Sequence, residues 1–123
     1  MIQLLTALKI NDNSGATAAK VIRVYNNRKY GVGGDLSLVS IKKNIPHSKV
    51  RKGDMSKGVL IRSNKRSYVI SHHQTWKGNN LVLITIKVND YYPLGTRIKG
   101  PVTSKLKSNR GCQKIVSISK RTL

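Results

Sequence analysis

Glutamate and phenylalanine are absent from this chain of 123 residues, and the four acidic residues are all aspartates. Each aspartate stands beside Gly or Asn in a turn-like stretch, where its carboxylate can accept hydrogen bonds from nearby backbone amides. Catalysis by paired carboxylates would need two of them to converge from separate turns. The sequence therefore argues against an enzyme.

Cysteine occurs once, at Cys112, which excludes an internal disulfide and favours an ordinary small side chain over a nucleophile. His72 and His73 are adjacent and have no nearby Cys or acid, so they are interpreted as surface residues and no metal site is predicted. The glycine-rich GVGGD at 31–35 precedes a strand-like segment, which favours a turn over a nucleotide-binding loop. No cofactor is expected.

Long apolar runs are missing too. The longest, LVLI followed by TI at 81–86, is far too short to cross a bilayer. The opening MIQLLTALKI lacks the basic start and extended apolar stretch of a secretion signal. An apolar content of 38% nevertheless suffices for a modest core. We expect a soluble protein with no membrane partner, folded as a single domain over 1–123.

Positive charge is what the chain has in excess. Its 24 Lys and Arg give a formal net charge of +20, and self-repulsion on that scale calls for a polyanionic partner. The cations cluster, mostly in predicted loops, at Arg28–Lys29, Lys42–Lys43, Lys49–Lys52, Lys65–Arg66 and Lys105–Lys107. Nucleic acid is the partner that accounts for these clusters most simply. One Trp, Trp76, and five Tyr are too few for base stacking as the main mode, so phosphate and 2′-hydroxyl contacts to folded RNA fit better.

Two-residue hydrophobic periodicity predicts strands, and these segments are rich in β-branched residues and bounded by turn chemistry. The candidates are 2–10, 18–25, 36–41, 55–62 and 81–88, with a further short apolar run, KIVSI, at 114–118. The only plausible helix lies in TSKLKSNR at 103–110. This pattern favours a mostly β fold, a barrel rather than a sandwich, because closure removes exposed edges. The barrel is expected over about 1–90 and a C-terminal loop and helix region over about 91–123.

The stretch YYPLGTRIKGPVTSKL at 91–106 alternates chain-breaking residues with hydrogen-bond donors. The residues that restrict or free the backbone are Pro93, Gly95, Gly100 and Pro101. Between them lie Thr96, Arg97 and Lys99, whose donors suit phosphate or carboxylate oxygens. We interpret the stretch as a stiff loop that presents donors to an anion.

In order and spacing, six stretches resemble the universal large-subunit ribosomal protein L-fourteen family, in its bacterial and organellar form. They are MIQ at 1–3, DNSGA at 12–16, GVGGD at 31–35, IPHSKVRKGD at 45–54, LGTRIKGPV at 94–102 and KIVSI at 114–118. The resemblance covers almost the whole chain. It implies a small five-stranded β-barrel with a projecting β-ribbon and a short C-terminal helical loop region. It also implies a structural constituent of the large ribosomal subunit that binds rRNA at the subunit interface.

Site residues follow from this resemblance, position by position. Those implied to bind large-subunit rRNA, or small-subunit rRNA across intersubunit bridges, are Lys43, Pro46, Lys49, Arg51, Lys52, Arg97, Lys99, Lys105 and Lys107. Those implied to form a protein-partner face, which resembles the docking surface for the ribosomal silencing factor, are Thr96, Arg97, Lys114 and Ser117. Ribosomal proteins three and nineteen are the implied neighbours.

Two stretches depart from the family pattern. The segment 63–80 lacks the Arg-Pro-Asp-Gly turn common in the family's ribbon, and the tail carries Lys120 and Arg121. Scarce acids and frequent Asn, Lys and Ile favour an AT-rich organelle genome, and no presequence precedes the family start. We therefore expect a mitochondrial ribosome, with the bacterial cytoplasm as the alternative. A free-standing barrel-fold RNA-binding factor is the alternative function.

Overall fold

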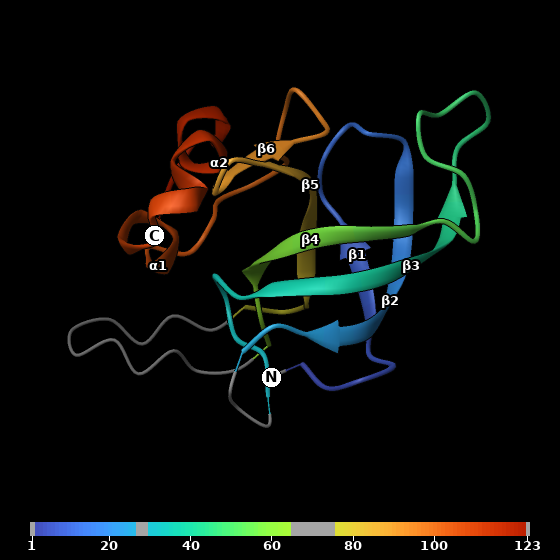
Figure 1. Cartoon of the computed structure of the whole chain (residues 1–123), viewed down its shortest axis with the longest axis horizontal. Coiled ribbons are helices and arrows are strands. Elements are labelled where there is room, and N and C mark those ends of the chain that lie inside the picture. The colour runs from blue at the N-terminus through green and yellow to red at the C-terminus, as the bar shows by residue number, and fades with distance from the viewer. Residues whose placement is uncertain (1, 27–29, 65–75, 123) are drawn as a thin grey trace.

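The computed structural model describes residues 2–26, 30–64 and 76–122, and its centre is a closed β-barrel (Figure 1). Each strand pairs antiparallel with the next along the chain, and β1 also pairs parallel with β5, which closes the sheet on itself. The barrel strands are β1 (Ala7–Ile10), β2 (Ala16–Val24), β3 (Leu36–Asn44), β4 (Met55–Arg62) and β5 (Asn80–Lys87). The predicted mostly β fold with a five-stranded barrel is confirmed.

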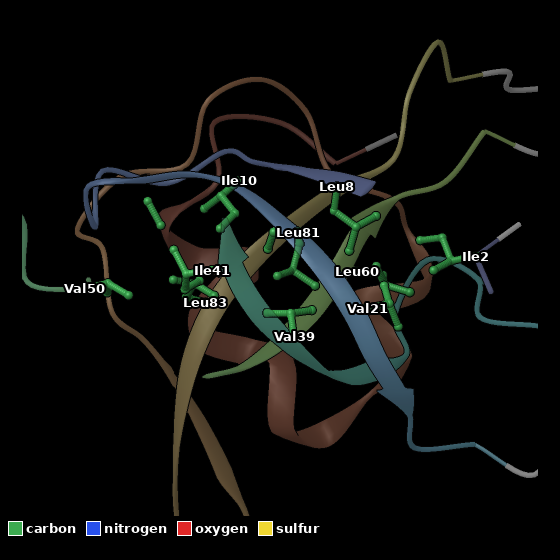
Figure 2. Packing of buried hydrophobic residues seen from close by; sticks show 12 residues of the cluster. Ile2, Leu8, Ile10, Val21, Val39, Ile41, Val50, Leu60, Leu81 and Leu83 are labelled. Carbon is green, nitrogen blue, oxygen red and sulfur yellow. The ribbon is translucent and has the colours of Figure 1, made fainter. Parts of the chain in front are cut away.

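The barrel interior is filled by aliphatic side chains that alternate along each strand. In β3, for example, Val39 and Ile41 are fully buried while the residues between them are partly exposed. Figure 2 shows such side chains from every barrel strand meeting inside. The cluster comprises Ile2, Leu8, Ile10, Ala16, Ala19, Val21, Val39, Ile41, Val50, Leu60, Leu81 and Leu83.

A second apolar layer covers the outside of β4 and β5, where consecutive residues are buried on both faces. Val59, Ile61, Val82 and Ile84 pack there against the C-terminal region, which supplies Ile98, Val102, Leu106, Cys112 and Ile115. That region contains two short helices, α1 (Lys105–Ser108) and α2 (Gln113–Ile118), with a 3-10 turn between them at Arg110–Cys112. The uninterrupted LVLI run of β5 therefore reflects a strand between two apolar layers.

The run KIVSI, expected as an extended strand-like segment, is helical in α2, so that prediction is wrong. Cys112 and Ile115, three residues apart, lie on one buried face of this turn, as helical spacing requires. Asn109 accepts a hydrogen bond from the Gly111 N–H at 3.2 Å just before the helix. At Gly111 an added Cβ would lie 3.0 Å from the ring of Tyr91, so glycine allows this close approach.

An additional strand that the sequence reasoning missed, β6 (Asp90–Pro93), pairs with β5 at the edge of the sheet. The two are joined by Val88 and Asn89, both with positive φ, at 44° and 66°. Pro93 is tolerated because it closes an edge strand.

The first strand begins later than the predicted 2–10. Leu5 has a φ of 64°, and Gln3 N donates to Thr6 Oγ1 at 3.0 Å, so a turn precedes β1. Residues 65–75 of the segment 63–80, where the projecting ribbon is predicted, lie outside the described residues, and so do His72, His73 and the cation pairs Arg28–Lys29 and Lys65–Arg66. Within the described ranges no helix is long and apolar enough to cross a membrane.

Candidate RNA-binding surface

Three loops meet along one side of the barrel, at the top of Figure 1. They are 11–15 between β1 and β2, 45–54 between β3 and β4, and 94–100 after β6. We refer to them together as the three-loop surface. Loop 11–15 lies in the middle and is anchored by Asp12, which is buried and accepts hydrogen bonds from Leu83 N and Ser14 N, each at 3.1 Å.

Asn13 joins the central loop to loop 94–100. Its Oδ1 accepts from the backbone N–H of Thr96 at 2.6 Å and of Arg97 at 3.2 Å, and its Nδ2 donates to Thr96 Oγ1 at 2.7 Å. Lys99 N donates to Asn11 O at 2.8 Å. An added Cβ at Gly95 would lie 2.5 Å from Asn13 Oδ1, so the two loops can only approach this closely with glycine there.

Gly15 joins the central loop to loop 45–54. Its carbonyl accepts from Ile45 N at 2.9 Å, and its φ is +101°. An added Cβ would come within 2.2 Å of Ser48 Cβ, which excludes any side chain. Within loop 45–54, Asn44 Nδ2 donates to Val50 O at 3.0 Å, and Asp54 Oδ2 accepts from Arg51 N at 3.0 Å. All three loops are thus held in one arrangement.

The predicted turn roles of Asp12, Asp35 and Asp54 agree with these contacts. Asp54 precedes β4 and follows Gly53, whose φ is 92°, and Asp35 precedes β3 and follows Gly34, whose φ is 95°. Asp35 Oδ2 accepts from Val32 N at 2.8 Å. Because these carboxylates accept hydrogen bonds from backbone N–H groups, they are not placed to form ion pairs with the surrounding cations.

The structure brings together most of the predicted rRNA-contacting residues, and all of them are exposed. Lys43 lies at the end of β3 and Pro46, Lys49, Arg51 and Lys52 on loop 45–54, while Arg97 and Lys99 lie on loop 94–100. Lys105 and Lys107 are elsewhere, on α1. There α1 borders the 31–35 turn, around a groove of about 400 Å³.

The predicted protein-partner residues come from two elements that lie next to each other. Thr96 and Arg97 line a groove of about 810 Å³ whose other wall includes Ile118 at the end of α2, and Lys120 beyond it. Lys114 and Ser117 are exposed on α2 itself. The Lys114 ammonium lies 3.5 Å from the centroid of the Tyr92 ring, a cation–π contact that fixes its position.

Sequence reasoning missed Arg62, whose side chain donates a hydrogen bond to the backbone of loop 94–100. Its Nη2 donates to Lys99 O at 3.1 Å, and its guanidinium carbon lies 5.9 Å from the ring of half-buried Trp76. Burial lowers the pKa of the Arg62 guanidinium. No pattern around this residue pointed to its role, since its partner is 37 positions away. The NDNSG turn was recognised as a turn, but the contact of Asn13 with loop 94–100 was not predicted.

The single cysteine is buried in the apolar layer between β4, β5 and the C-terminal region. Burial raises the pKa of the Cys112 thiol to about 11, so the reactive thiolate is scarce at neutral pH. Among the described residues, no three of His, Cys, Asp and Glu gather where they could hold a metal ion.

A small basic β-barrel with rigid cation-bearing loops is typical of ribosomal proteins. The family model described as ribosomal protein L14p/L23e matches residues 1–123, and the chain belongs to this family. It is thus a structural protein of the large ribosomal subunit, and the family implies ribosomal RNA and ribosomal proteins as its partners.

Proposed function

We propose that the three-loop surface binds large-subunit rRNA at the subunit interface and contributes to bridges with small-subunit rRNA. The observation that carries this proposal is the rigid coupling of the loops through Asn13 and Gly15. Loops held in one geometry place their cations without a further ordering cost on binding, which favours contact with a partner of fixed shape such as folded RNA.

Loop 45–54 is the part of this surface that we assign to the small subunit. It projects beyond the ends of β3 and β4 at the edge of the molecule (Figure 1). Lys49, Arg51 and Lys52 are exposed on it, and Asp54, the only acid in the loop, accepts a backbone hydrogen bond at its base. Cations on a protruding loop can reach a second RNA surface, whereas interior rRNA contacts would not need them there.

The test replaces Lys49 and Arg51 together by Ser. We expect large subunits to assemble but to join small subunits less well, with a defect that grows as magnesium falls, because phosphate contacts add up weakly. Light scattering of purified subunits across a magnesium series measures the association. A charge-matched control, Lys9→Ser with Lys77→Ser, removes two exposed cations that line a different groove. Unchanged association of the Lys49 and Arg51 variant at every magnesium concentration would place the loop against large-subunit RNA instead.

The groove between loop 94–100 and α2 supports a role in protein docking. Thr96, Arg97, Lys114 and Ser117 border it or lie beside it, and we assign them to a face for the ribosomal silencing factor, with ribosomal proteins three and nineteen as neighbours. Lys114→Ala should weaken binding of purified silencing factor to the large subunit in a pull-down. Binding equal to that of wild type would remove Lys114 from this face.

We further propose that the chain serves a mitochondrial ribosome and folds as one domain over 1–123. The absence of glutamate and the +20 charge support an organellar gene of biased composition. Immunoblotting of purified mitochondria and cytosol tests the location, and limited proteolysis tests the domain. A signal confined to the cytosol would contradict the first proposal, and a stable core ending near residue 90 would contradict the second.

A further inference from the structure

A β-bulge in β2 places two side chains on the outer face of the barrel. Simple alternation along the strand would have buried both of them. Ala19 and Val21 point inward, and Val21 pairs with Val39 of β3. The next pair is Arg23 with Leu38, so Ile22 is an extra residue on β2. Beyond it the inside–outside phase is reversed, and Arg23 and Tyr25 are exposed where continued alternation would have buried both.

The reversal places Arg23 in line with a cation two strands away. Leu38 pairs with Arg23 of β2 on one side and with Lys57 of β4 on the other. The Tyr25 ring makes cation–π contacts with both, at 5.2 Å from the Arg23 guanidinium carbon and 5.6 Å from the Lys57 ammonium. The ring is 38% exposed, so the two cations and the ring reach the surface together.

This outer face of β2, β3 and β4 carries no acid. Its other exposed or partly exposed positions are Lys20, Ile22, Ser40, Lys42 and Met55. Two carboxylates lie just before its strands: Asp35 accepts from Val32 N at 2.8 Å and Asn26 Nδ2 at 2.7 Å, and Asp54 accepts from Arg51 N at 3.0 Å. Two cations that share one ring therefore have no anionic partner within the face itself.

We propose that the Arg23–Tyr25–Lys57 group is a second RNA contact, which holds backbone phosphates through the guanidinium and ammonium while the Tyr25 ring fixes their spacing. This inference rests on the proposed function, since the partner is RNA, but it concerns different residues. An aromatic ring that contacts two cations holds them in defined positions before RNA binds. Unrestrained side chains would lose entropy on binding to reach the same positions. The guanidinium fork suits phosphate oxygens, and the ammonium adds a point charge.

The test measures lysine acetylation of the purified full-length chain by mass spectrometry, with and without a mixed-sequence RNA duplex of about 20 base pairs, long enough to span several phosphate contacts. RNA should slow acetylation of Lys57 at least threefold. Lys49 and Lys52 report the three-loop surface in the same sample. Protection of Lys49 and Lys52 with unchanged Lys57 would overturn this inference and leave the proposed function standing, whereas protection of none of them would overturn both.

Three further comparisons test the ring, the guanidinium and the kind of polyanion. Tyr25→Leu should reduce the protection of Lys57 by RNA, and Tyr25→Phe should retain it, because only the second keeps the ring. Arg23→Gln should lower the slope of log affinity against log salt by about 1, as loss of one phosphate contact requires. Poly-L-glutamate at equal charge should protect Lys57 less than RNA does. Equal protection by poly-L-glutamate would indicate an acidic protein partner and overturn the assignment to RNA.

Discussion

Removing the Asn13 side chain should loosen loop 94–100 without disturbing the barrel core. Asn13→Ala deletes an acceptor shared by the Thr96 and Arg97 N–H groups and a donor to Thr96 Oγ1. Each such bond contributes a net ~0.5–1.5 kcal/mol. Because the hydrogen bonds of Asn13 are exposed and water can replace the lost partners, the lower part of that range applies. We expect the free energy of unfolding to fall by about 2 kcal/mol in total.

Urea unfolding followed by circular dichroism measures this change. With an m-value of about 1.5 kcal/mol/M, the midpoint should fall by roughly 1.3 M while the slope stays constant. Asn13→Asp is the matched control, because it keeps the acceptor for both N–H groups and loses only the donor. It should lower the free energy of unfolding by less than about 1 kcal/mol. An Asn13→Ala variant within about 0.5 kcal/mol of wild type would refute the claim that this residue holds the two loops together.

Three further predictions concern other parts of the chain. Val88→Asn should raise the free energy of unfolding by about 1 kcal/mol in urea titrations. Val88 is 94% exposed and has a φ of 44°, at which a β-branched residue is strained. A lower urea midpoint for the variant would contradict this. Burial raises the pKa of Cys112 to about 11 from an ordinary 9.0, so the free energy of unfolding is highest below pH 9, where the thiol is neutral in both states, and it falls by about 3 kcal/mol as the pH rises through 11. Thermal melts from pH 8 to 11 should therefore fall less steeply for Cys112→Ala, and parallel curves would exclude the effect. Arg97→Lys should lose to wild type in a competition for incorporation into large subunits, because the guanidinium fork is lost, and equal incorporation would count against a bidentate role.

The barrel strands could be predicted because their signals are local. The strands expected at 18–25, 36–41, 55–62 and 81–88 coincide closely with β2 to β5. Two of them, β3 and β4, follow Gly-Asp turns in which Gly34 and Gly53 adopt positive φ, a turn chemistry that is visible in the sequence. Periodicity and turn chemistry sufficed there because each strand has an interior face.

The C-terminal region could not be read in the same way. The six residues of α2, QKIVSI, suit a short strand or one and a half helical turns equally well, and only packing decides between them. Cys112 and Ile115 are buried against the outside of β4 and β5, a surface that exists only after the barrel closes. The strand β6 likewise depends on a turn at Val88 and Asn89, in which Asn89 signals a turn but the β-branched Val88 does not.

The cations of the candidate site were visible in the sequence, but their supports were not. Arg97 was identified from its loop, whereas Asn13, 84 positions away, holds its backbone. The outward position of Arg23 and Tyr25 depends on a bulge at Ile22, and one extra residue in a strand reverses every side chain beyond it. The kinds of cationic side chain at the candidate site can be read from the sequence. Their positions depend on how the barrel closes.

Sedimentation of the chain with ribosomal subunits tests the central claim most directly. Mitochondrial lysate is layered on sucrose gradients at rising salt, and the protein is followed by immunoblotting. A structural constituent held by many fixed rRNA contacts should remain with the large subunit through a high-salt wash. Release into the top fractions, steeply dependent on salt, would show a factor held by a few phosphate contacts and would contradict the account.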